Sequence, residues 1–120
     1  SGLLLANDLN GSNNNWTYLQ NTATSGGSNL VINTSSGGVT IDGSGNILPN
    51  ADNSQNLGSS SLRWANIYTG DLHLSNETQA QGNSVDGTKG NWTIQEGEED
   101  LYIVNNKSGK KYKFSLQEIQ

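Results

Sequence analysis

The chain has 120 residues, a net charge of −5 and no cysteine. These features exclude disulfides and cysteine-ligated metal centres, and its six Lys and Arg residues are too few to follow a nucleic-acid backbone. No apolar run approaches the roughly 18 residues that a membrane-spanning helix needs, so we expect no membrane insertion.

The composition is poor in residues that can form a core. Apolar residues make up 31% of the chain and mean hydropathy is −0.65, against about 45–50% apolar residues in ordinary domains. Ordering one residue costs about 1.5 kcal/mol, while apolar burial contributes about 25 cal/mol per Å². Charged residues are only 14%, which is low for a disordered chain. We therefore expect an obligate oligomer. Met is absent, position 1 included, so we also expect the chain to be part of a longer polypeptide.

Residues 1–49 show short apolar runs separated by Asn-, Gly- and Ser-rich turns, and no helical period fits them. We predict a β-rich N-terminal module that ends at Pro49. The predicted strands are 3–6, 16–19, 30–33, 39–42 and 46–48.

Residues 50–78 form a predicted central part. Ser59, Ser60 and Ser61 are candidate N-caps for one helical turn through 62–64. Short strands are expected at 65–69 and 72–75.

Residues 79–120 predict an antiparallel β-meander with strands at 92–96, 101–105 and 110–116. If Asn105 pairs with Lys110, Ile103 lies opposite Tyr112 and Leu101 opposite Phe114, which gives one apolar face. Lys111 and Lys113 then lie on the other face, beside Val104 and Tyr102. Three strands alone are barely stable, so the apolar face should pack on the central part or on another subunit. The residues expected to pack in this core or in a trimer are Trp64, Ile67, Tyr68, Leu72, Leu74, Trp92, Leu101, Ile103, Tyr112 and Phe114.

Few residues suggest a ligand-binding or metal-binding site. Trp16 and Tyr18, beside an Asn-rich loop, are candidates for stacking on a saccharide, although strand aromatics more often belong to a core. His73 is the single histidine. Three copies could hold an ion on a threefold axis, against the simpler interpretation of a solvent-facing strand residue.

Two further patterns are weaker. Residues 42–46 resemble the opening of a calcium loop, but Ile47 and Asn53 stand where glycine and glutamate are required, which favours a plain turn. No nucleophile–base arrangement is visible, and the carboxylates of 96–100 cluster at a predicted turn. We therefore expect no enzyme activity and no cofactor.

Three segments carry a resemblance to a known family. The string Leu57-Gly58-Ser59-Ser60-Ser61, followed by Arg63-Trp64, Asn66 and Tyr68, is similar to segments of the distal tail fibres of tailed bacteriophages, and 96–102 and 105–112 resemble fibre C-termini. The likeness covers about residues 29–120. Many relatives continue into a self-cleaving chaperone domain opened by a Ser-Asp-x-Arg motif, which this sequence lacks, so self-cleavage is not expected of it.

The resemblance implies an all-β, elongated and intertwined homotrimer in the virion tail fibre. Its expected partners are other copies of the chain, other virion tail proteins and a glycan or protein receptor on the host surface. The alternatives are a carbohydrate-binding module and a non-catalytic part of a polysaccharide depolymerase tailspike.

Overall fold

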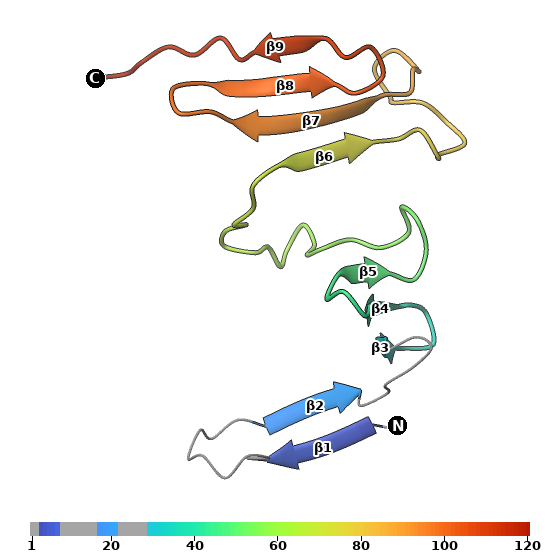
Figure 1. Ribbon diagram of the computed structural model, residues 1–120. Coiled ribbons are helices and arrows are strands. Elements are labelled where there is room, and N and C mark those ends of the chain that lie inside the picture. The colour runs from blue at the N-terminus through green and yellow to red at the C-terminus, as the bar shows by residue number, and fades with distance from the viewer. Residues whose placement is uncertain (1–2, 8–16, 22–28) are drawn as a thin grey trace. The chain divides into compact units, whose positions relative to one another are not determined.

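The structure is a computed structural model that describes residues 3–7, 17–21 and 29–120. The described residues form three antiparallel sheets and no helix, which confirms the all-β class (Figure 1). The chain divides into two compact units, Ser1–Ser59 and Ser60–Gln120, whose boundary falls inside the segment 50–78. Each unit is described by itself.

The first unit contains a two-stranded sheet and a three-stranded sheet. In the two-stranded sheet, β1 (Leu3–Asn7) pairs antiparallel with β2 (Thr17–Asn21). The three-stranded sheet consists of β3 (Leu30–Asn33), β4 (Gly38–Ile41) and β5 (Ile47–Pro49) in that order.

Strand register makes one face of the three-stranded sheet wholly apolar. Leu30 lies opposite Ile41 and Ile41 opposite Ile47, and the next row joins Ile32, Val39 and Pro49. Side chains alternate between the two faces of a strand, so these six residues share a face. Ile47 remains 72% exposed, and within residues 29–59 none of these six side chains is buried.

The turns of this sheet are fixed by local hydrogen bonds. Thr34 donates its backbone N–H to the Gly37 carbonyl over 2.7 Å and closes the β3–β4 turn. Gln55 then fastens the following loop to β4, because its Oε1 accepts from the Asn50 N–H at 2.8 Å and its Nε2 donates to the Gly38 carbonyl at 2.7 Å.

The second unit is one four-stranded antiparallel sheet, with β6 to β9 in chain order (Figure 1). Its strands are β6 (Leu72–Ser75), β7 (Asn91–Glu96), β8 (Leu101–Asn105) and β9 (Lys111–Lys113).

The predicted register of the last hairpin is confirmed. Ile103 pairs with Tyr112, and Asn105 donates its backbone N–H to the Lys110 carbonyl at 2.9 Å. Phe114 donates to the Leu101 carbonyl at 2.9 Å, so the ladder continues one step past β9.

Two predictions for the central segment were wrong. Residues 62–64 form no helical turn and 65–69 form no strand. A single helical turn fixes several residues for one hydrogen bond and is unfavourable without further support. The strand 72–75 is present, but it belongs to the C-terminal sheet, which therefore has four strands. Leu72 and Leu74 lie opposite Ile94 and Trp92 there and extend the apolar face.

Neither the three-stranded nor the four-stranded sheet encloses a hydrophobic core among the described residues. Among residues 29–120 no apolar side chain is buried, and the single buried residue is Thr93, which is 4% exposed. The part of the chain that the structure describes contains no helix suited to crossing a lipid bilayer.

Candidate functional site

The C-terminal sheet has two faces of opposite character. We call one the apolar face; Glu96 and Asn105 lie on it at opposite ends, by the register of β7 with β8. The apolar face consists of Leu72, Leu74, Trp92, Ile94, Leu101, Ile103, Tyr112 and Phe114.

The side chains of the apolar face remain open to solvent. Leu72 and Leu74 are each 48% exposed. Trp92, Ile94 and Ile103 are half-buried. Exposed apolar patches are a common feature of interaction surfaces.

The opposite face, which we call the polar face, is organised around Thr93. The Oγ1 of Thr93 lies 3.0 Å from His73 Nδ1 and accepts a hydrogen bond from Asn106 Nδ2 at 2.9 Å. Asn106 also donates to Asn91 Oδ1 at 2.8 Å. If the Thr93 hydroxyl donates to Nδ1, His73 carries its proton on Nε2. The polar face consists of His73, Ser75, Asn91, Thr93, Gln95, Tyr102, Val104, Lys111 and Lys113.

The position of His73 bears on the predicted metal site. His73 lies on the face opposite the apolar one, and its Nδ1 is already in contact with Thr93. Within the described residues no group of three or more His, Asp and Glu side chains is arranged to hold a metal ion. The threefold-axis ion stays a prediction, and it requires the copies to meet through the polar face.

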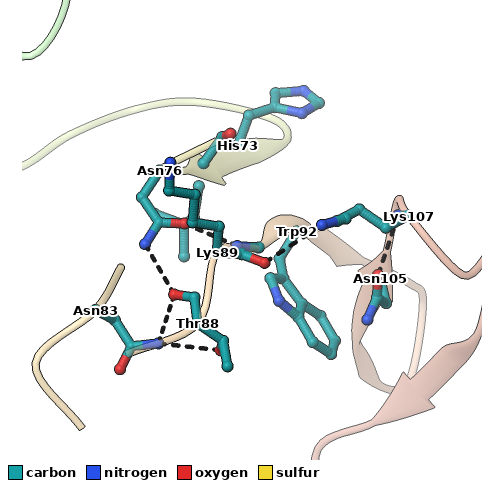
Figure 2. Close-up of a pocket in the computed structure, with 11 residues that line it drawn as sticks. His73, Asn76, Asn83, Thr88, Lys89, Trp92, Asn105 and Lys107 are labelled. Carbon is teal, nitrogen blue, oxygen red and sulfur yellow. Dashed lines mark hydrogen bonds between the residues drawn. The ribbon is translucent and has the colours of Figure 1, made fainter. Parts of the chain in front are cut away.

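A hollow of about 600 Å³ opens at the end of the sheet, where residues 76–90 connect β6 to β7. Figure 2 shows the Trp92 indole between the Thr88–Lys89 segment on one side and Asn105 on the other, with the His73 ring turned away from it. The indole lies close against the connection, because a Cβ added at Gly90 would meet Trp92 Nε1 at 2.9 Å.

Most of the polar groups around this hollow form hydrogen bonds or ion pairs with one another. Lys107 Nζ lies 3.5 Å from the Lys89 carbonyl and 4.0 Å from Glu77 Oε1, and Glu77 Oε2 accepts from Asn91 at 2.9 Å. Asn76 Oδ1 accepts from the Gly90 N–H at 2.7 Å. The arrangement holds the connection in place.

A compact loop at 83–88 completes that connection. Asp86 Oδ1 accepts from the Thr88 N–H at 3.0 Å, from the Thr88 hydroxyl at 2.8 Å and from Asn83 Nδ2 at 2.7 Å. These bonds, the Thr88 N–H first, hold the pKa of Asp86 below its usual 3.8. This loop was not predicted from the sequence. The alternation of Asn and Asp with small residues was the available signal.

Of the predicted site residues, two are described only in part or not at all, and three lie outside the strands. Trp16 lies outside the described residues, and of Tyr18 the backbone alone is described, in β2 opposite Ala6. Trp64 and Tyr68, like Ile67, lie in a segment without strand or helix; Tyr68 is 93% exposed, and none of the three joins the apolar face.

The remaining packing residues named from the sequence come together on the apolar face. Ile94 was missed, although the alternation of Trp92, Thr93 and Ile94 identifies it. It occupies the centre of the face, opposite Leu72 on one side and Ile103 on the other.

The calcium-like segment is a turn between β4 and β5. The Asp42 carboxylate accepts from the Ser44 N–H, from the Asn46 N–H and from Asn46 Nδ2, each at 2.9 Å. The Asn46 side chain is the largest cause of a lowered Asp42 pKa. Gly45 has a φ of +86°, a conformation that glycine adopts without strain. Both carboxylate oxygens are therefore engaged within the turn.

Comparison of the chain with protein-family models, with curated proteins and with solved structures gave no match.

Proposed function

We propose that this chain is a non-catalytic, structural segment of a bacteriophage tail fibre, which forms a homotrimer and presents a surface for attachment to the host cell. The observation that carries the proposal is that, among residues 29–120, the three- and four-stranded sheets each leave an apolar face uncovered and no apolar side chain is buried. The resemblance of residues 57–68 to fibre segments supports it.

The energetics favour a covered apolar face. Fully burying a Leu, Ile or Phe side chain contributes about 1.5–3 kcal/mol. Eight side chains that are roughly half exposed would then supply on the order of 6–12 kcal/mol when covered. That is comparable with the whole free energy of unfolding of a small domain, about 5–15 kcal/mol. Covering this face would therefore decide whether the sheet is stable.

Because the apolar face is nearly free of charge, further copies of the chain can serve as the covering partner. Each copy carries a net charge of −5, so approach through charged surfaces would be unfavourable. The apolar face has no cation, and its one carboxylate, Glu96, lies at an end of β7. Identical faces arranged about a threefold axis would bury one another without burying an unpaired charge.

A trimer built in this way would direct the polar faces outward. Side chains with hydrogen-bonding and charged groups would then be available to a host receptor, and the fibre location in the virion follows from this role. The same chain would contact other tail proteins along the fibre.

The oligomeric state tests the proposal. We expect light scattering to give the mass of three 12.8 kDa chains at micromolar concentration, and the melting temperature to rise with protein concentration. A folded monomer whose melting temperature is independent of dilution would overturn the proposal.

A further inference from the structure

The cations of the chain gather in one short region. Lys107, Lys110, Lys111 and Lys113 account for four of the six Lys and Arg residues, in a chain whose net charge is −5. β9 places Lys111 and Lys113 on the polar face, where they lie opposite Val104 and Tyr102. Two of these cations thus lie on the same face as the Tyr102 ring.

Lys111 and Lys113 line an open hollow of about 400 Å³ on the C-terminal sheet. Its lining includes Tyr102, Val104, Gln95 and the two lysines. The Tyr102 ring is 38% exposed and lies tightly over Gly97, because a Cβ added there would meet the ring at 2.7 Å. The ring is therefore held as a platform before any ligand arrives.

The charged groups near the hollow are only partly satisfied. Lys113 Nζ lies 3.8 Å from Asp100 Oδ1, and both side chains are solvent-accessible, so the pair is weak. Within the described residues Lys111 has no ion pair. Gln95 Nε2 donates to Asp71 Oδ2 at 3.2 Å, which leaves Gln95 Oε1 as an acceptor.

We propose that this hollow binds an acidic saccharide, with the sugar ring on Tyr102 and its acidic group between Lys111 and Lys113. Asp71, Asp100 and Gln95 would accept hydrogen bonds from the hydroxyl groups. The inference rests on the proposed function, because a trimer joined through the apolar face leaves this polar face outermost.

Two features favour a saccharide over other anions. The hollow lies on the polar face of the sheet and not along the free edge of β9, where a peptide strand could add by backbone hydrogen bonds. The Asp100 carboxylate, 3.8 Å from Lys113 Nζ, would repel an anionic polymer that has no hydroxyl groups to donate to it. A ligand with a carboxylate on each sugar ring and hydroxyl groups beside it suits both constraints.

The test is a calorimetric titration of the full chain with oligogalacturonate, dextran and polyglutamate. We expect oligogalacturonate to bind, more weakly as salt is added, and the other two polymers not to bind. The double variant Lys111→Gln, Lys113→Gln should bind roughly tenfold more weakly. Arg63→Gln with Lys89→Gln removes the same charge away from this hollow and should bind as the natural chain does.

A second variant separates a sugar site from simple charge attraction. Tyr102→Leu keeps the net charge and should weaken oligogalacturonate binding severalfold, whereas Tyr102→Phe should not. Equal binding by the two double variants, an unaffected Tyr102→Leu variant, or equally tight binding of polyglutamate would each overturn the inference.

Light scattering on the same samples distinguishes the two proposals. A trimer that binds none of the three polymers overturns this inference and leaves the proposed function standing. A monomer overturns the proposed function, while the titration with the lysine variants still decides whether the hollow binds the sugar.

Discussion

The rings of Trp92 on β7 and Tyr112 on β9 meet across the intervening strand β8, with centroids 5.9 Å apart and planes tilted by 40°. Both side chains lie on the apolar face, by the register of β7 and β9 with β8. Tilted aromatic pairs add roughly 0.5–1.5 kcal/mol beyond the area that they bury. The pair therefore joins β7 to β9 within the apolar face.

Neighbouring residues of β8 offer a matched test of which face joins the copies. Ile103 and Val104 are both half-buried and lie on opposite faces. We expect Ile103→Lys to give monomers, because an unpaired ammonium group buried between subunits costs several kcal/mol. Val104→Lys should remain trimeric. Light scattering measures both, and a trimeric Ile103→Lys or a monomeric Val104→Lys would contradict the assignment of faces.

The hydroxyl of Thr93 should matter more than its methyl group. Thr93→Val would leave Asn106 Nδ2 and His73 Nδ1 without this partner, and we expect it to lower the free energy of unfolding by about 1–3 kcal/mol. Thr93→Ser keeps the hydroxyl and should cost less. Denaturant unfolding measures the difference, and a Val variant as stable as the Ser variant would show that this hydrogen-bonded centre contributes nothing.

Adjacent glycines in the first unit should respond differently to an added methyl group. A Cβ at Gly38 would collide with the Asn33 side chain and the Ile32 carbonyl, whereas a Cβ at Gly37 would approach the Gln55 side chain no closer than 3.5 Å. We expect Gly38→Ala to destabilise the β3–β4 hairpin by about 1–3 kcal/mol and Gly37→Ala to have little effect. Hydrogen exchange of the hairpin amides is the measurement, and faster exchange in Gly37→Ala than in Gly38→Ala would contradict it.

The loop at 83–88 should respond to acid. Because hydrogen bonds from Thr88 and Asn83 lower the pKa of Asp86, its carboxylate stabilises the loop at pH values above 3.8. That stabilisation is lost as the pH falls below 3.8 through the lowered pKa. The Thr88 amide shift in NMR should follow this titration and lose it in Asp86→Asn. A midpoint above 3.8 would contradict the assigned hydrogen bonds.

Local signals predicted part of this fold well. The hairpin of β8 and β9 was predicted in register because charged and aromatic residues alternate along 111–114, so that one register places Tyr112 and Phe114 opposite Ile103 and Leu101, and because Gly109 ends the turn, where its φ is +74°. The strand at 72–75 was also predicted, since Leu72 and Leu74 flank His73. In each case the pattern lies within a few residues.

Features that depend on distant residues were not predicted. The pairing of β6 with β7 joins strands separated by residues 76–90, and nothing local specifies it. The helical turn at 62–64 was inferred from capping residues, which cannot stabilise a turn that lacks a longer helix. The hydrogen bonds of Thr93 bring together β6, β7 and Asn106, so they appear only once the sheet is formed.

The strict alternation of side chains in β6 to β9 has an evolutionary consequence. Substitutions at 73, 95, 102, 104, 111 or 113 change the surface offered to other molecules without altering the row that includes Ile94 and Ile103. Selection can thus diversify one set of positions while it conserves the interleaved set, and new recognition properties can arise on a scaffold whose assembly is unchanged.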